Sequence, residues 1–398
     1  MSERLLRPAL VLGLLSCIGP FAIDMFLPAM PQIAAALNTG VAEMQWTITA
    51  YFIAFGLAQL AYGPWADQAG RKPPLYAGIG IFAIGSAICT FAPNAEVLIA
   101  GRAVQGLGGA AMMVVPRAII RDLYTGPRAT QLMAAVMLVI SVSPMLAPLA
   151  GAGLMALAGW RAIFAALLVA AAVSLAVLTL LQPETLAPEH RHPFRFAETR
   201  AAAGKLLRDK GFLALTFLGG FGMASFFVFI ASAAFVYTEH YGLSPTGFSL
   251  AFAVNALGFF GASQVAGPLG MRFGARPVMA AAAALFAVAT LGTFGLALAG
   301  IQPLILVIGG LFLANAGLGL VIPTAMVLAL EDHGEEAGLA SSLGGTLQML
   351  TGGVMVALAG PFFDGTPLPM LGAIAVCGVA AFALSRVVKA GVAGAQAA

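Results

Sequence analysis

The sequence predicts an all-α integral membrane protein whose twelve transmembrane helices form two pseudo-symmetric bundles of six. Three observations lead to this fold class. Of the 398 residues, 61% are hydrophobic and 9% are charged, whereas a soluble domain carries about 25% charged residues. The apolar residues form continuous runs of about 20, as membrane-spanning helices do, and do not alternate with polar residues as barrel strands do. One long polar stretch near the midpoint divides these runs into two sets.

Twelve apolar windows follow one another along the chain, and each is long enough for one membrane-spanning helix. They cover residues 8–30, 46–66, 75–92, 97–117, 130–157, 161–182, 212–236, 246–268, 277–299, 302–330, 337–361 and 367–388. The first window follows Arg4 and Arg7, as the apolar core of a signal peptide follows basic residues. Because it contains Asp24 and Pro28, is followed directly by Pro31 and lacks a small-residue cleavage site, we interpret it as a transmembrane helix.

The polar stretch from Gln182 to Gly211 predicts the domain organisation. We expect an N-terminal six-helix bundle at 1–182, a cytoplasmic linker at 183–211 and a C-terminal six-helix bundle at 212–398. Within the linker, AETRAAAGKLLRDK could form an amphipathic helix on the inner leaflet or a plain solvated connection.

The two halves repeat each other in sequence. GPWADQAGRKP (63–73) and GPLGMRFGARP (267–277) align without a gap at an offset of 204 residues, and both join the second and third spans of a half. This pattern indicates internal duplication, which is a recurrent architecture of transporters that rock two halves around a central site.

The distribution of basic residues predicts the orientation. Of the 19 Lys and Arg residues, seventeen lie on one side of the predicted spans, so this side is expected to be cytoplasmic and to hold both termini. The acidic turn EDHGEE (331–336), between the tenth and eleventh spans, departs from this trend. We assign no role to it.

Five motifs resemble those of one transporter family. GPWADQAGRK (63–72) resembles the signature loop of the major facilitator superfamily, and LIAGRAVQGLGGAA (98–111) resembles its fourth-helix motif. IDMFLPAMPQIA (23–34), PRAIIRDLY (116–124) and SVSPMLAPLAG (141–151) resemble the bicyclomycin and chloramphenicol resistance branch, the Bcr/CflA type, of the proton-coupled drug antiporters. The resemblance covers the whole chain and implies the fold of that superfamily.

The chain departs from the family pattern at several positions. Ala147, Ala152 and Ser143 stand where span 5 of the antiporters commonly has glycine, and Gln68 replaces a frequent basic residue. Small residues still allow close helix approach, so the mechanical role of span 5 is retained. In the second copy of the loop, Met271 replaces the aspartate, so a conformational lock is expected only in the first half.

The resemblance implies a gating role for residues of the signature loop and of two helices. The predicted gating residues are Gly63, Asp67, Gly70, Arg71, Lys72, Asp122, Pro144 and Pro148. The loop charges are expected to latch the outward-open state, with Asp67 against a helix N-terminus of the other half. The alternatives are a plain solvated charge cluster and, for the two prolines, ordinary helix kinks.

Asp24 and Arg102 are the only formal charges well inside the predicted windows. At about 1.5 Å per residue, both lie roughly 8 to 9 Å below the outer boundary of their spans. A charge inside a membrane almost always faces a bundle interior or an aqueous cavity. One interpretation is a static ion pair that fastens two helices. The other, which we prefer, is a proton site at Asp24 that Arg102 tunes, because Arg itself stays charged.

A cavity for drugs combines apolar, adaptable walls with a few polar anchors. The candidate substrate-binding residues lie on spans 2, 4, 7, 8, 10 and 11, although a given Phe or Met is more often a core or lipid-facing side chain. They are Tyr51, Gln59, Met112, Met113, Phe226, Phe227, Phe229, Asn255, Asn315 and Gln348, with Tyr51, Asn255 and Gln348 preferred.

Several classes of function lack their motifs. No GxxxxGK[ST] sequence is present, so ATP is not the expected energy source. There is no GxSxG nucleophile motif and no intramembrane His, Cys or carboxylate cluster for a metal ion. Basic residues do not interleave with aromatic ones, which disfavours nucleic acid as a partner. We expect neither an enzyme nor a cofactor.

The resemblance therefore predicts a multidrug efflux antiporter of the bacterial inner membrane. It is expected to export small hydrophobic or amphipathic drugs, of phenicol or bicyclomycin type, in exchange for protons by alternating access. Drug, protons and membrane lipids are the expected partners, and the family implies a monomer. Two alternatives stay open: a proton-coupled exporter of a sugar or other metabolite, and an importer or uniporter.

Overall fold

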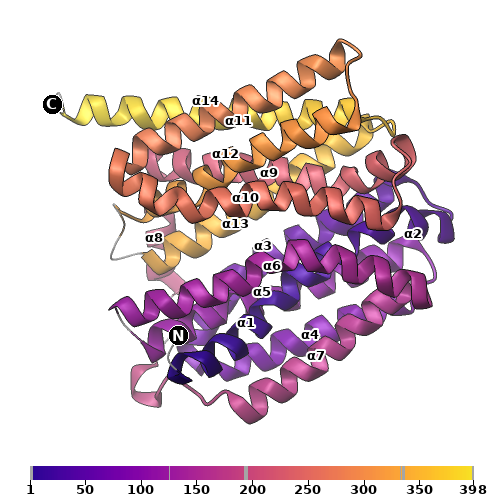
Figure 1. Ribbon diagram of the computed structural model, residues 1–398. Helices are drawn as coiled ribbons and strands as arrows, with labels where there is room; N and C mark the ends of the chain where they lie inside the picture. Colours follow the sequence, from indigo (N-terminus) through magenta and orange to yellow (C-terminus); the bar gives the residue numbers. More distant parts are fainter. Residues whose placement is uncertain (1–2, 125, 192–195, 332, 334–336, 397–398) are drawn as a thin grey trace. The chain divides into compact units, whose positions relative to one another are not determined.

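The computed structural model describes residues 3–124, 126–191, 196–331, 333 and 337–396, and this part of the chain contains helices and no strand. The chain forms two compact units, Met1–Arg195 and Phe196–Ala398. The division between them falls inside the stretch 183–211 that the sequence marks as a linker. Figure 1 shows the long helices of each unit lying alongside one another.

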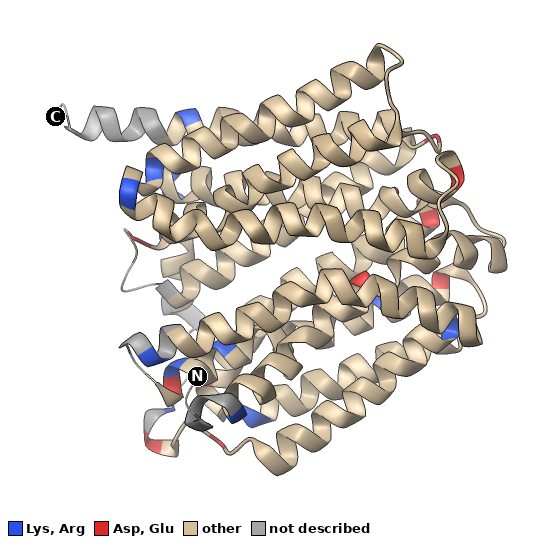
Figure 2. Cartoon of the chain, viewed as in Figure 1, with Lys and Arg blue, Asp and Glu red and all other residues tan. Residues whose placement is uncertain are grey.

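The first unit is built from long helices and a few short elements. Its described elements are α1 (Glu3–Asp24), the 3-10 turn η1 (Leu27–Ala29), α2 (Met30–Ala36), α3 (Val41–Ala69), α4 (Lys72–Thr90), α5 (Ala95–Leu123), α6 (Gly126–Ala158), α7 (Arg161–Leu181) and η2 (Pro188–His190). Figure 2 shows that most Lys and Arg residues of this unit lie at one end of its helices.

The second unit has the same kind of construction. Its described elements are α8 (Phe196–Leu206), α9 (Lys210–Phe235), the π-helical segment η3 (Val236–His240), α10 (Pro245–Phe273), α11 (Ala275–Leu298), α12 (Leu304–Glu331), α13 (Ala337–Ala359), η5 (Gly360–Phe362) and α14 (Pro367–Gln396). The acidic turn at 331–336 lies largely outside the described residues.

The two units repeat one helix-pairing pattern. In the first unit, α3 and α4 pack against α5, α1 packs against α5 and α6, and α4 packs against α7. In the second unit, α10 and α11 pack against α12, α9 packs against α12 and α13, and α11 packs against α14. If the six long helices of each unit are numbered in chain order, leaving out the short α2 and α8, the same pairs are in contact in both units. The duplication predicted from two short loops therefore extends to the packing of both six-helix bundles.

Eleven helices of the described residues are long and apolar enough to cross a membrane, where the sequence predicts twelve. Each predicted window coincides largely with a helix, and the difference concerns α3 alone. This helix has 29 residues but carries Gln45 and Gln59, which lower its apolarity. Both glutamines are buried, so these two amides face protein and not lipid.

The first predicted span is not one continuous helix. The window 8–30 predicts a helix through Asp24, but α1 ends at Asp24, and η1 and α2 follow it. Pro28 and Pro31 cause the break, because neither can donate the backbone hydrogen bond that a helix interior requires. Asp24 therefore lies at a helix end and not within a regular turn, although the apolar span continues from Arg7 to Ala36.

Glycines in α5 allow three helices of the first unit to approach closely. A Cβ on Gly106 would overlap the carbonyl oxygen of Tyr51 in α3, and a Cβ on Gly108 would overlap the backbone of Phe82 in α4. Small residues of this kind let helix backbones come together where no water is present to drive association. The glycine-rich part of the fourth-helix motif thus explains why α3 and α4 both pack on α5.

A second close approach joins α6 to the end of α1. Gly151, the last residue of the span-5 motif, lies so near the turn after α1 that a Cβ would overlap the carbonyl oxygen of Met25. Met25 follows Asp24 directly, so the motif is in contact with the backbone beside the buried carboxylate. Pro144 and Pro148 lie inside α6, which continues through both of them.

The linker contains a helix, as one of the two alternatives for it predicts. Its sequence AETRAAAGKLLRDK overlaps α8, and Leu206 at the end of this helix is fully buried. Leu206 belongs to an apolar cluster with Phe212, Leu328 and Leu343. This end of the linker therefore packs on the second unit as part of its core.

Replacing Gly151 with alanine tests the contact between α1 and α6. We expect Gly151→Ala to destabilise the protein by about 1–3 kcal/mol, because a backbone oxygen cannot move aside as a flexible side chain can. The matched control is Gly153→Ala on the same helix, where nothing lies within 4 Å of the new Cβ. Thermal unfolding in detergent measures both variants. Equal melting temperatures for the two would contradict the close approach.

Candidate proton site and gate

The guanidinium of Arg102 is the centre of a buried polar network in the first unit. The residue lies in α5, and its side chain is the largest fully buried one among the described residues. Its Nη1 donates to the carbonyl of Ala22 in α1 at 3.0 Å and to Oε1 of Gln105. The guanidinium carbon lies 4.5 Å from the ring centroid of Tyr51 and 5.0 Å from that of Phe26. Both rings stabilise the buried cation through their π faces.

The network continues from α5 into α4. Nε2 of Gln105 donates to Oγ of Ser86 at 2.8 Å, and the Ser86 hydroxyl donates to the carbonyl of Phe82 at 2.8 Å. By contrast, Nε and Nη2 of Arg102 are buried and have no hydrogen-bond partner in the described chain. Because buried N–H groups are rarely left unpaired, these two donors are open to an acceptor.

Asp24 lies beside this network but forms no close ion pair with it. The residue is 4% exposed at the end of α1, two positions after the Ala22 carbonyl that Arg102 contacts. Within the described residues, no Lys, Arg or His nitrogen comes within 4.0 Å of its carboxylate. The static ion pair considered from the sequence is therefore absent. What joins α1 to α5 is the hydrogen bond from Arg102 to a main-chain carbonyl.

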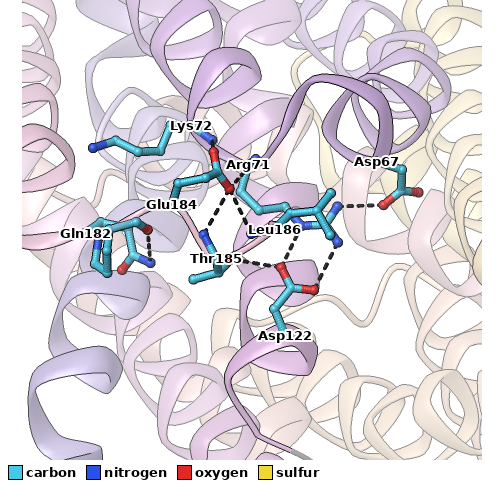
Figure 3. Close-up of polar contacts among 9 residues, drawn as sticks. Asp67, Arg71, Lys72, Asp122, Gln182, Glu184, Thr185 and Leu186 are labelled. Carbon is cyan, nitrogen blue, oxygen red and sulfur yellow. Dashed lines mark hydrogen bonds and ion pairs between the residues drawn. The ribbon is translucent and has the colours of Figure 1, made fainter. Parts of the chain in front are cut away.

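Three of the predicted gating charges, Asp67, Arg71 and Asp122, form one cluster in the structure (Figure 3), whereas the ammonium group of Lys72 lies over the ring of Tyr76. Arg71 is buried, and its guanidinium donates to both carboxylate oxygens of Asp122, at 2.7 and 3.0 Å, and to Asp67. The contact with Asp122 is the two-pronged arrangement in which arginine binds a carboxylate most strongly. Arg71 is therefore a bound and not a freely solvated charge. The expected contact of Asp67 with the other half stays a prediction.

Gly70 has a backbone conformation that explains why glycine stands there. Its φ is +97°, a value that side-chain-bearing residues rarely adopt. A Cβ at this position would also lie 2.7 Å from Oε2 of Glu184. Lys72 begins α4, and Gly63 lies inside α3, where an added Cβ would have nothing within 4 Å outside the helix backbone.

Two residues of this cluster are missed by the sequence patterns. Glu184 accepts hydrogen bonds from the backbone N–H groups of Arg71 and Lys72, at 2.9 and 3.0 Å. Thr185 donates from its hydroxyl to Asp122 at 2.8 Å. Both belong to the PETL stretch just after α7, where nothing local distinguishes them from a solvated linker. The one available signal is a carboxylate directly after a membrane span.

The carboxylate of Glu184 is held in its charged form. Burial opposes ionisation, but N–H hydrogen bonds from the backbones of Lys72, Arg71, Leu186 and Thr185 keep its pKa below the ordinary value. A lowered pKa means that the charged carboxylate stabilises the folded protein above the pKa of the unfolded chain. That contribution is lost as the pH falls through the folded pKa.

The candidate substrate residues of the first unit are buried to different degrees. Tyr51 is fully buried, donates to the carbonyl of Gly19 at 3.3 Å and lies against Arg102, so it belongs to the network. Gln59 and Met112 are buried in α3 and α5, and Met113 is half-buried. Among the described residues, no hydrogen bond joins these three to Arg102.

The aromatic candidates of the second unit lie together between α9 and α10. The ring of Phe226 lies 6.4 Å from those of Phe227 and Phe252 and 6.5 Å from that of Phe259. Phe229 stacks on Phe252 at 5.7 Å. These rings form one aromatic cluster, which the sequence spacing within α9 predicts only in part because α10 supplies Phe252 and Phe259.

The amide candidates of the second unit are not joined to one another. Asn255 donates to the carbonyl of Ala251 in its own helix at 3.2 Å, while its Oδ1 is buried without a partner in the described chain. Asn315 is buried in α12. The Gln348 amide lies against α9, where a Cβ on Gly219 would come within 2.6 Å of Nε2.

Comparison with known proteins decides the family. The family model described as Major Facilitator Superfamily matches residues 12–357 and, in a second match, 216–395. The chain belongs to the Major Facilitator Superfamily. The expected resemblance is therefore confirmed, and this facilitator is a multi-pass membrane transporter of the Bcr/CflA type.

Relatives of this facilitator align along almost its full length. It is 34% identical over 382 residues to an uncharacterised MFS-type transporter of Bacillus subtilis, YdgK, covering 94% of each chain. It is 29% identical over 368 residues to a bicyclomycin resistance protein homolog of Haemophilus influenzae, covering 92% of each. The crystal structure of a D-xylose-proton symporter has the same fold, with a TM-score of 0.75, 14% identity and 96% of each chain covered.

The pKa of Glu184 leads to a prediction about acid. We expect Glu184→Gln to have a lower melting temperature than wild type at pH 7, where the charged carboxylate holds four backbone N–H groups. The difference is expected to shrink as the pH falls through the lowered pKa of Glu184 and to vanish below that pKa. Taking the difference between the two proteins removes the contribution of other carboxylates. A difference that is constant with pH would contradict a charged Glu184.

Proposed function

We propose that this facilitator is a multidrug efflux antiporter that exchanges drugs for protons, with Asp24 as the proton carrier. The observation that carries the proposal is a carboxylate buried at the end of α1 with no cation within 4.0 Å in the described chain. A charged carboxylate in such a place is expensive, and protonation removes the charge. Asp24 can thus exist in two states whose balance depends on hydration and on its neighbours.

Arg102 is suited to tune this balance. Its guanidinium is anchored by Ala22, Gln105 and two aromatic rings, and still has two unpaired N–H groups. When Asp24 loses its proton, its carboxylate can turn to these donors. When it gains one, the pair separates. Arg102 therefore gives the charged form of Asp24 a partner without carrying a proton itself.

The span-5 motif connects this site to helix packing. Gly151 of α6 touches the backbone of Met25, the residue after Asp24. A shift of α6 would therefore move the turn that carries the carboxylate. We infer that the prolines of α6, which remove backbone hydrogen bonds, make that part of the helix easier to bend.

The substrate class follows from the relatives and from the second unit. A bicyclomycin resistance homolog aligns over 92% of this chain, which supports drugs as substrates. The aromatic cluster of α9 and α10, with the buried amides of Asn255 and Asn315, supports small hydrophobic or amphipathic compounds. We place the transporter in the bacterial inner membrane as a monomer, with both termini and the basic ends of its helices in the cytoplasm.

Replacing Asp24 tests the proton role. We expect Asp24→Asn to abolish proton-driven accumulation of chloramphenicol in everted vesicles, because asparagine cannot bind and release a proton. Asp364→Asn, at an exposed loop carboxylate, is the control and is expected to keep wild-type uptake. Wild-type uptake by Asp24→Asn would show that this carboxylate is not the proton carrier.

The direction of proton movement separates antiport from its alternatives. On adding drug to everted vesicles with an acidified lumen, we expect protons to leave the lumen as drug enters it, giving alkalinisation of the lumen. The Asp24→Asn variant is expected to give no such signal. Proton entry together with drug would support a symporter. A separate test expresses the protein in a strain that lacks its own drug pumps and measures resistance to a panel of drugs. If resistance to no drug changes, export of a sugar or other metabolite is supported instead.

A further inference from the structure

The start of the linker holds the turn between α3 and α4 through one carboxylate. Glu184 accepts from the N–H groups of Arg71 and Lys72, at 2.9 and 3.0 Å, and from those of Thr185 and Leu186, at 2.9 and 3.0 Å. Figure 3 shows these four bonds converging on the Glu184 side chain. The two bonds to its own neighbours orient the carboxylate, and the two others bind it to residues 113 and 112 positions away.

The position of this carboxylate is favourable for a physical reason. The first N–H groups of a helix have no partner within the helix, and the helix dipole adds positive charge there. Arg71 is the N-cap residue of α4 and provides no side-chain cap for it. Glu184 supplies the missing acceptor and the negative charge. The cap of α4 therefore comes from the linker and not from the signature loop.

The next residue holds the other side of the same cluster. Thr185 donates to Oδ2 of Asp122 at 2.8 Å, and this oxygen also accepts from Nε of Arg71 at 2.7 Å. Asp122 stands one residue before the end of α5. Two consecutive linker residues thus bind the backbone on one side of the Arg71–Asp122 pair and the carboxylate on the other.

Gly70 leaves space for the Glu184 carboxylate, and comparison with Gly274, its counterpart in the second repeat, separates the effect of this carboxylate from that of the backbone turn. Gly274 occupies the same place in the second copy and also has a positive φ, +87°. A Cβ on Gly70 would meet the Glu184 carboxylate at 2.7 Å, whereas a Cβ on Gly274 would meet only Pro277, at 3.4 Å, among the described residues. The backbone turn is common to both copies. The carboxylate held against it belongs to the first copy.

We propose that Glu184 and Thr185 are positioning residues of the gate. This two-residue clasp sets Arg71 and Asp122 in the hydrogen-bonded arrangement described above during each transport cycle. The proposal rests on the transport function proposed above. According to this proposal the beginning of the linker takes part in gating, whereas the sequence predicts only a cytoplasmic linker there. It also adds a polar, uncharged contact, that of Thr185, to a cluster otherwise defined by charge.

The first experiment uses two isosteric substitutions, Thr185→Val and Glu184→Gln, and one conservative control, Thr185→Ser, in the full-length protein. Thr185→Val removes the hydroxyl and Thr185→Ser keeps it, while Glu184→Gln removes the charge. We expect Thr185→Val and Glu184→Gln to lower chloramphenicol turnover in proteoliposomes at least fivefold, and Thr185→Ser to recover at least half of the wild-type rate. Chloramphenicol binding in detergent is expected to change less than twofold, because the clasp acts on the gate and does not touch the drug.

A double-mutant cycle tests whether the contact acts through Asp122. If Thr185 positions Asp122, the turnover of Thr185→Val combined with Asp122→Asn equals that of Asp122→Asn alone. Independent, multiplying losses would overturn the positioning role. So would wild-type turnover of Thr185→Val.

The two glycines provide the matched control for backbone strain. Gly70→Ala and Gly274→Ala both place a side chain at a positive φ, but only the first displaces the carboxylate. We expect Gly70→Ala to lower turnover at least fivefold and Gly274→Ala to stay within twofold of wild type. Equal losses in both would show strain alone and would overturn the clasp.

Hydrogen exchange distinguishes failure of the clasp from failure of the proposed function. In Glu184→Gln, the peptide that carries the N–H groups of Arg71 and Lys72 is expected to exchange at least fivefold faster than in wild type, whether or not the protein moves chloramphenicol. If wild type moves no drug but exchange is faster in the variant, the proposed function fails and the clasp holds. If wild type moves drug and the variant shows unchanged exchange, the clasp fails.

Discussion

The buried guanidinium of Arg102 is the constraint around which the first unit is arranged. A fully buried cation is tolerated only where acceptors and aromatic faces surround it. Three helices supply such groups: α1 offers the Ala22 carbonyl, α3 the ring of Tyr51, and α5 the amide of Gln105. A fourth helix, α4, holds that amide through the hydroxyl of Ser86. The charge therefore favours the inward orientation of these helix faces, and two of its N–H groups stay unpaired in the unit that also buries Asp24.

Close backbone approach is what makes this arrangement possible. Gly106 lets α5 meet α3 at Tyr51, Gly108 lets it meet α4 at Phe82, and Gly151 lets α6 meet α1 beside Asp24. Lipid tails are as apolar as leucine, so small residues and shared hydrogen bonds, and not a hydrophobic driving force, favour contact between such helices. The motifs that resemble family signatures thus supply small residues for helix packing as well as charged and polar side chains.

The two units share a packing pattern but differ in charge. The described buried polar residues of the second unit are all neutral, being hydroxyl and amide side chains, whereas those of the first include Asp24, Arg71 and Arg102. In the repeated loop, Asp67 and Arg71 correspond to Met271 and Ala275. Duplication has kept the glycine turn and the helix pairs. Among the described residues, the buried charges Asp24, Arg71 and Arg102 belong to the first copy.

The sequence by itself determined the membrane class, the helix windows, the duplication and the two buried charges, because each depends on local composition or on repeated motifs. Only the tertiary structure decided that Arg102 binds a main-chain carbonyl instead of the Asp24 carboxylate, and that Glu184 caps α4. These facts join residues up to 113 positions apart. No periodicity records such a pair, since the contact exists only after helices have packed and backbone N–H groups have been left needing an acceptor.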